Sequence, residues 1–226
     1  MKQSNKEQLF NCKGWLACNR IGHLAEMHHI FNENYNTLLN TIDEIRQQCF
    51  PKEIFFSPHD RFKRHAFNFL MSATALRDNC RRIINYYKDT EIQREYEQKV
   101  KVFHCSLVSF VEGLRNYNAH VRIILPDIVK SPINSQQWDI ILMTPNLLQT
   151  NFNWSTLART YMKQYGPEIN FKDLCLQYHT MIDQFYNWLY ARLLAYHKED
   201  FIAKERLIDK LGLRQELKQI TSLFRN

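Results

Sequence analysis

A periodic apolar stripe between residues 62 and 87 constrains the fold of this chain more than any other feature. Its members recur alternately four and three residues apart, the spacing of one face of an α-helix, and they are Phe62, Ala66, Phe69, Ala73, Leu76, Cys80, Ile83 and Tyr87. A helix of this kind needs partners that cover its apolar face, as in a helical bundle. The 226 residues include only 5 glycines, which disfavours tight-turned sheets. These features together predict an all-α fold.

Helical spacing also marks most of the remaining chain. We predict one or two helices over 6–48, a helix from Glu91 that runs into the sequence GLRNYNAH, a helix over 154–165 with Asn153 as its N-cap, and a long helix over 171–196. The segment 88–90 is a short turn, so the helices on its two sides should pack antiparallel. The tail KEDFIAKERLIDKLGLRQELKQI predicts one or two charged amphipathic helices.

Two stretches interrupt the helical pattern. Two prolines make Phe50–Pro58 a connection between helices. The β-branched segments VRIIL and WDIILM predict a small hairpin that pairs 121–124 with 138–143. We expect a single α-helical domain over 1–226, with a core at about 60–200 and a C-terminal helical extension over 201–226.

The charge and the cysteines narrow the range of partners. The net charge of +7 suits a polyanionic partner such as RNA, although the basic residues are interleaved with acidic ones. The six cysteines form no C-x-x-C pair, so we expect them to be reduced and buried, without a disulfide framework, a zinc site or a cofactor. The chain shows no signal-peptide pattern and no run of 18 apolar residues, so we expect a soluble, cytoplasmic protein that does not contact membranes.

The sequence GLRNYNAHVRI at 113–123 contains the strongest candidate for a catalytic site. Arg115 is followed by the polar Asn116, and His120 lies five residues after the arginine. A histidine can accept the proton of a 2′-hydroxyl near neutral pH or protonate a leaving oxygen. A guanidinium can bind the phosphate oxygens on which charge develops, and Asn116 could orient either group. These three residue types suit RNA cleavage without a metal.

The spacing of the pair raises a geometric difficulty. In an unbroken helix, five residues turn His120 about 140° away from Arg115. The asparagines favour a helix end, where a loosened last turn could bring the pair together. Alternatively, a second subunit could complete the site.

The sequence RNYNAH at the end of a helix in an α-helical protein resembles the R-x4-6-H signature of the HEPN superfamily. In that family a polar residue commonly follows the arginine, as Asn116 does here. The resemblance implies a helical bundle that dimerises to form an RNA-cleaving cleft, with Arg115, Asn116 and His120 as the catalytic set. Many members of the family are bacterial toxins or phage-defence ribonucleases, so an antitoxin or regulatory protein is an implied partner. The likeness covers about 60–120 and extends to the helices after Asn153.

Chance alone also produces such spacings, and a second match, Arg192 with His197, lies within the strongly periodic helix 171–196 and its end. We interpret that second pair as a solvated arginine and histidine on a packed helix. His104 could line a long cleft on the same helix face as Arg115, but we interpret it as a packing residue.

Further basic and acidic residues lie near the motif in the predicted bundle. Arg77, Arg81 and Arg82 could bind RNA phosphates, and a solvated helix face is the alternative for them. Asp78 or Glu112 could orient Arg115. The sequence therefore predicts a metal-independent endoribonuclease, and a non-catalytic helical module that binds RNA, nucleotide or a partner protein is the alternative.

Overall fold

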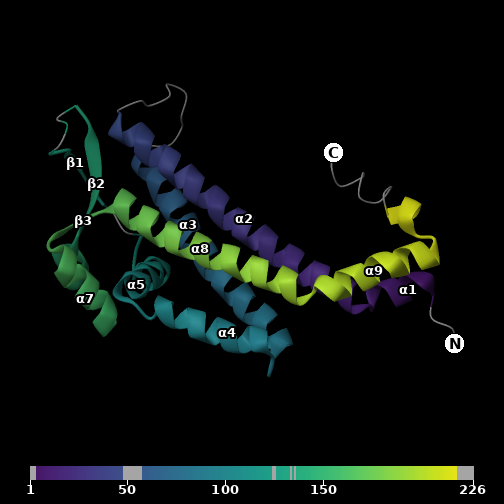
Figure 1. Ribbon diagram of the computed structural model, residues 1–226. Coiled ribbons are helices and arrows are strands. Elements are labelled where there is room, and N and C mark those ends of the chain that lie inside the picture. Colours follow the sequence, from purple (N-terminus) through teal and green to yellow (C-terminus); the bar gives the residue numbers. More distant parts are fainter. Residues whose placement is uncertain (1–3, 48–57, 124–125, 133, 135, 218–226) are drawn as a thin grey trace. The chain divides into compact units, whose positions relative to one another are not determined.

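Helices dominate this computed structural model, which describes residues 4–47, 58–123, 126–132, 134 and 136–217 (Figure 1). The chain forms two compact units. The larger unit is Met27–Tyr186, and the smaller unit is Met1–Glu26 with Asn187–Asn226. Two long helices, α2 (Lys13–Arg46) and α8 (Phe171–Tyr196), contribute residues to both units. The predicted all-α fold with a small β insertion is confirmed, whereas the connection predicted at Phe50–Pro58 falls almost entirely outside the described residues.

The core of the larger unit contains the apolar stripe of α3 (Pro58–Ile84) and the 3₁₀-helix η1 (Asn85–Tyr87) that follows it. All eight stripe residues are buried, as predicted. Aromatic side chains from three helices meet there, since Phe69 of α3 stacks on Phe31 of α2 at 5.4 Å and meets Tyr178 of α8 edge-on at 6.2 Å. The predicted helix over 171–196 has the bounds of α8.

The single helix predicted from Glu91 into GLRNYNAH is wrong. The structure has α4 (Glu91–Val100), the 3₁₀-helix η2 (Lys101–Phe103) and, after a break, α5 (Ser106–His120). At the break His104 has a ψ of 53° and Cys105 is extended, with a ψ of 166°, so neither continues a helix. The break accompanies the packing of Phe103 edge-on against Phe185 of α8 at 4.9 Å, a tertiary contact that helical periodicity does not reveal.

A three-stranded antiparallel sheet follows α5, with the order β1–β2–β3. The strands are β1 (Asp127–Lys130), β2 (Trp138–Met143) and β3 (Glu168–Asn170). The second strand of the predicted hairpin is confirmed. Its first strand is wrong, because β1 begins at Asp127 and pairs Ile128 with Ile140. The N–H groups of Val121 and Arg122 instead donate to the Tyr117 carbonyl at 2.9 and 3.3 Å, which closes the end of α5.

Close packing against α7 (Thr156–Tyr165) and the loop before it fixes the position of α5. The ring of Phe110 stacks on Tyr161 at 4.9 Å, and that of Tyr117 stacks on Trp154 at 5.8 Å. A Cβ at Gly113 would lie 2.7 Å from the Trp154 ring, so only glycine fits at this contact. Ser155 caps α7, two residues after the predicted cap, and Gly166 ends the helix as predicted. The short helix α6 (Thr144–Leu148) precedes this segment.

The smaller unit contains α1 (Asn5–Phe10) and α9 (Lys198–Leu211), together with the first part of α2 and the last part of α8. A capping box between Ser4 and Glu7 starts α1, and Gly212 ends α9 in the left-handed conformation, with a φ of 67°. The amphipathic helix predicted for the tail is therefore confirmed in α9. In the described ranges, every helix is too short or too polar to span a membrane.

Candidate functional site

The residues predicted as a catalytic set lie on the last two turns of α5. The helix ends at His120, as the resemblance implied, but its last turn remains α-helical instead of loosening. Buried side chains at Leu114 and Tyr117 hold this turn against the core, so it follows the regular 3.6-residue repeat. The side chains of Arg115 and His120 therefore leave α5 in directions about 140° apart. One chain does not bring the two side chains together.

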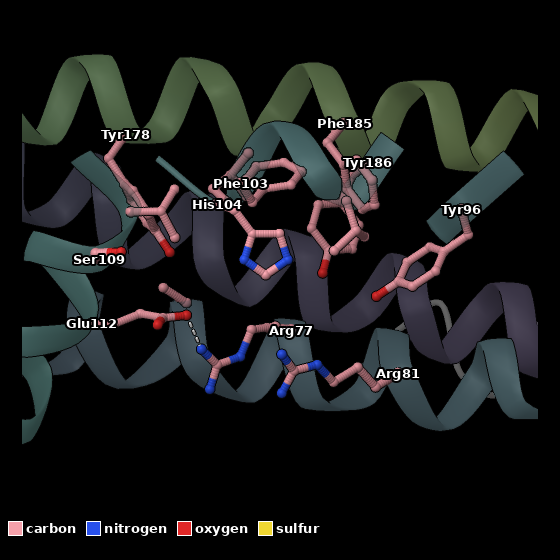
Figure 2. Close-up of a pocket in the computed structure, with 14 residues that line it drawn as sticks. Arg77, Arg81, Tyr96, Phe103, His104, Ser109, Glu112, Tyr178, Phe185 and Tyr186 are labelled. Carbon is pink, nitrogen blue, oxygen red and sulfur yellow. Dashed lines mark hydrogen bonds and ion pairs between the residues drawn. The ribbon is translucent and has the colours of Figure 1, made fainter. Parts of the chain in front are cut away.

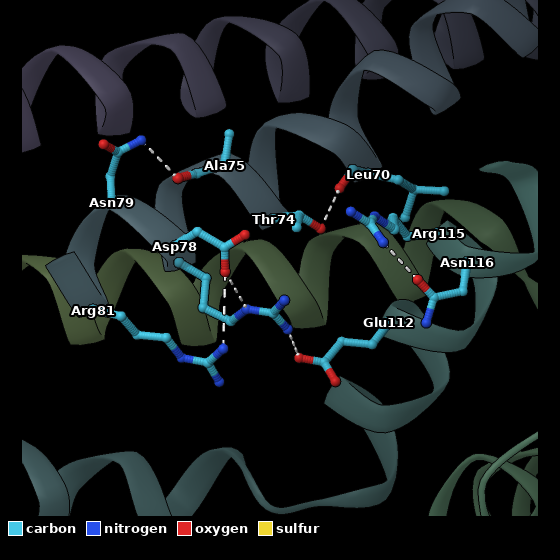
Figure 3. Close-up of polar contacts among 10 residues, drawn as sticks. Leu70, Thr74, Ala75, Asp78, Asn79, Arg81, Glu112, Arg115 and Asn116 are labelled. Carbon is cyan, nitrogen blue, oxygen red and sulfur yellow. Dashed lines mark hydrogen bonds and ion pairs between the residues drawn. The ribbon is translucent and has the colours of Figure 1, made fainter.

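Asn116 and His120 instead share one exposed face of α5, since they are four residues apart and both are exposed. The Arg115 guanidinium is directed toward this face at Asn116, because its Nη1 donates a hydrogen bond of 2.6 Å to the Asn116 Oδ1 (Figure 3). The Nε of Arg115 is buried and has no hydrogen-bond acceptor among the described residues. The asparagine thus links the arginine to the face that carries the histidine.

The acidic residues considered as partners of Arg115 bind other arginines. Glu112 of α5 accepts a hydrogen bond from Arg77 Nη1 of α3, and Asp78 lies 3.4 Å from Arg77 Nε and 3.8 Å from Arg81 Nη1 (Figure 3). Partial burial opposes the charge of Arg77, but the carboxylates of Glu112 and Asp78 outweigh it and raise the pKa of this guanidinium. The Arg77–Glu112 pair ties α3 to α5 one turn before Arg115.

The three arginines predicted to bind nucleic acid do not form one surface. Arg77 and Arg81, four residues apart, both line a cavity. Arg82 is exposed, donates a hydrogen bond of 2.9 Å to the Asn79 Oδ1 and is not part of the cavity lining. Its position next to Arg81 turns it by about 100° around α3. Of these three arginines, only Arg81 and Arg82 have largely exposed side chains that could contact a phosphate backbone.

The cavity has a volume of about 150 Å³ and lies among α3, α4, η2, α5 and α8 of the larger unit (Figure 2). Its polar lining groups include Arg77, Arg81, His104, Ser109 and Glu112, and its aromatic lining is Tyr96, Phe103, Tyr178, Phe185 and Tyr186. Burial raises the pKa of Tyr178 and of Tyr96 above the usual range, so both phenols stay neutral at physiological pH.

Sequence reasoning missed this cavity. The aromatic residues of α8 were assigned to a packed helix face, and His104 was interpreted as a packing residue. In the structure His104 is exposed at the break between η2 and α5, and its imidazole points into the cavity (Figure 2). The lining comes from three stretches that are far apart in the sequence, 73–81, 96–112 and 178–186, so no local spacing could have revealed it.

The second arginine–histidine match lies in the smaller unit. His197 is buried and its Nδ1 is 2.7 Å from the Asp200 Oδ2 at the start of α9. The interpretation of His197 as a solvated residue is therefore wrong, because its ring is buried and its Nδ1 has the Asp200 carboxylate as a hydrogen-bond partner. A structural role explains this histidine.

Comparisons with protein-family models, with characterised proteins and with solved structures each found no match to this chain. The HEPN resemblance consequently depends on the residues of α5 and on the helical fold.

Proposed function

We propose that this protein is a metal-independent endoribonuclease of HEPN type that acts as a homodimer. The observation that carries the proposal is the exposed face at the end of α5, where His120 lies beside Asn116, and Asn116 accepts a hydrogen bond from the Arg115 guanidinium. The imidazole and the amide thus share an exposed helix face, and the amide is hydrogen-bonded to the guanidinium.

The reaction would be attack of the ribose 2′-oxygen on the adjacent phosphorus. His120 would accept the 2′-hydroxyl proton, or in its protonated form donate a proton to the departing 5′-oxygen. The P–O5′ bond would break as the new P–O2′ bond forms, which gives a 2′,3′-cyclic phosphate and a 5′-hydroxyl. Arg115 would stabilise the charge on the non-bridging oxygens, and Asn116 would hold that guanidinium in place.

The regular last turn of α5 supports a dimer as the active form. Since Arg115 and His120 of one chain diverge by about 140°, a single phosphate would be reached by the histidine of one copy and the arginine of the other. A two-fold axis beside the end of α5 would bring two such pairs together, because an isologous contact repeats every residue on both sides.

The family resemblance extends the proposal to a prokaryotic toxin–antitoxin or phage-defence setting, with an antitoxin or regulatory protein as a further partner and cytoplasmic RNA as the substrate.

A cleavage assay tests this function. A labelled single-stranded RNA is incubated in EDTA with the wild-type protein, with His120→Ala and with His29→Ala, an exposed histidine on α2 that serves as a matched control. We expect wild type and His29→Ala to cut the RNA and His120→Ala to lose at least about a hundredfold in rate, the usual contribution of a general acid or base. An RNA with 2′-deoxy residues should remain intact.

The alternative function is a non-catalytic helical module that binds RNA, nucleotide or a partner protein. The divergence of Arg115 and His120 within one chain favours this alternative where no second chain completes the pair. An absence of cleavage by the wild-type dimer on several RNAs, together with retained RNA binding, would establish that alternative and exclude the enzyme.

A further inference from the structure

We propose that the cavity among α3, α4, η2, α5 and α8 binds a small planar ring that carries a phosphate or carboxylate, with the ring inside and the anionic group at Arg81. This ligand site is distinct from the face formed by Asn116 and His120, and it does not rest on the proposed ribonuclease activity. His120 lies eight residues beyond Glu112 on α5, about 12 Å along the helix axis from the cavity edge.

The size of the cavity suits one ring. Its volume of about 150 Å³ equals that of an engineered protein cavity that admits benzene. A polynuclear ligand would not fit inside, but a substituent on the ring could extend through the open side toward Arg81. The side chain of Arg81 is 60% exposed, which places the guanidinium at the opening.

The aromatic wall provides contacts for the faces and edges of such a ring. Phe185 meets Phe103 edge-on at 4.9 Å and Tyr96 edge-on at 5.8 Å, and Tyr178 and Tyr186 complete the wall from α8 (Figure 2). Rings with centroids 4.5–7 Å apart gain stabilisation beyond the area that they bury. A mainly apolar wall with a few convergent polar groups is the usual composition of a small-molecule site.

The charges at the opening select an anion. Arg77 is held by Glu112 and by Asp78, so its charge is balanced and its side chain is fixed. Among the described residues, Arg81 has one ion pair, a distant one with Asp78 at 3.8 Å, so most of its donors are available to a phosphate or carboxylate. The imidazole of His104 points into the same space and makes no hydrogen bond with the described residues, so it offers a second donor (Figure 2).

Calorimetric titration of the full chain with phenyl phosphate tests the proposal. Phenol provides the ring without the anion, and inorganic phosphate provides the anion without the ring. We expect saturable binding of one phenyl phosphate per chain and binding at least about tenfold weaker for each of the two fragments, because each lacks one half of the recognition. Equal affinities for inorganic phosphate and phenyl phosphate would overturn the proposal, since they would indicate a surface anion site.

Two matched variants locate the binding. Arg81→Gln should weaken phenyl phosphate at least about tenfold, whereas its neighbour Arg82→Gln, which is outside the cavity lining, should leave the dissociation constant within about twofold. Ser109→Phe adds a ring to the lining and should block binding, and an unchanged thermal unfolding midpoint establishes that each variant folds. Equal losses in the two arginine variants, or no binding by the wild type, would contradict the proposal.

Uridine monophosphate distinguishes the source of the ligand. If it binds more tightly than phenyl phosphate and with the same dependence on Arg81, the natural ligand is a nucleotide. If it binds more weakly, while phenyl phosphate and benzoate bind through Arg81, the ligand is a simple aromatic acid or ester.

Discussion

Gly113 shows how a single residue positions the candidate site. A Cβ at this position would lie 2.7 Å from the ring of Trp154, which is buried and held by a hydrogen bond of 3.1 Å from its Nε1 to the Leu147 carbonyl. Because the ring cannot move aside, α5 would have to shift, and the end of α5 carries Arg115, Asn116 and His120.

We therefore predict that Gly113→Ala lowers the free energy of unfolding by about 1–2 kcal/mol, because overpacking outweighs the gain in helix propensity. Gly22→Ala, on α2, is the matched control, since a Cβ at that position would have no neighbouring atom within 4 Å. That control should stabilise the protein by up to about 1 kcal/mol. Urea denaturation measures both, and a stabilising Gly113→Ala would contradict the close contact.

A buried histidine, His28, and a half-buried one, His179, make the larger unit sensitive to acid. His179 stacks on Tyr35 at 3.7 Å and its Nε2 is 2.9 Å from the Asn32 Oδ1. Partial burial lowers the pKa of His179; Asp183 partly opposes this, and the nearby His28 adds to the lowering. Burial also lowers the pKa of His28, although Asp183, 3.2 Å away, partly opposes this.

Because the folded state binds these protons less tightly than the unfolded state, stability is complete above the ordinary histidine pKa of about 6.5 and falls as the pH drops below it. We predict a lower urea midpoint at about pH 5.5 than at about pH 7.5. His179→Gln should reduce this difference, and His29→Gln, an exposed histidine on α2, should not. A midpoint that stays constant or rises on acidification would show that folding does not lower the pKa of these histidines.

At the scale of elements, apolar periodicity correctly predicted the helices that bury one regular face. The α3 stripe and the bounds of α8 were predicted correctly because each helix buries one regular face. The break at His104 and Cys105 was missed, because Phe103 and Leu107 are four residues apart and fit one continuous stripe. Strand β3 was missed because its three residues are too few to show a periodic pattern. It also pairs with a distant segment, since Ile169 lies opposite Leu142 of β2.

The break between η2 and α5 leads to a test with a substitution. Cys105 has the extended backbone of an N-cap but makes no side-chain capping bond to α5. A serine there could accept a hydrogen bond from the backbone N–H of residue 108, so Cys105→Ser should be about 0.5–1 kcal/mol more stable than Cys105→Ala in urea denaturation. Equal stabilities of the two variants would mean that α5 does not begin at this position.

At the scale of the whole molecule, the sequence predicted the candidate catalytic residues but not the cavity. Arg115, Asn116 and His120 lie within six residues of one helix, so a motif could reveal them. The cavity depends on how α3, α4, α5 and α8 pack. Among its lining residues, Arg77 and Arg81 had been selected for RNA binding and Glu112 as a partner of Arg115, but none of the three as part of a cavity.

A dimeric site predicts complementation between inactive chains. Arg115→Ala and His120→Ala should each be inactive as homodimers. After unfolding and refolding together in equal amounts, they should recover about a quarter of the wild-type activity, because half of the dimers are mixed and each mixed dimer has one intact site of two. An active wild type whose mixed variants stay inactive would place both residues of each site in one chain.

The chemical ends of the RNA products test the proposed ribonuclease most directly. Mass spectrometry of an RNA cut in EDTA distinguishes attack by the 2′-hydroxyl from attack by water. We predict fragments with 2′,3′-cyclic phosphate and 5′-hydroxyl ends, since His120 and Arg115 would act on the 2′-oxygen and the phosphate. Fragments with 3′-hydroxyl and 5′-phosphate ends, or RNA that stays intact, would contradict the assignment of α5 as the catalytic helix.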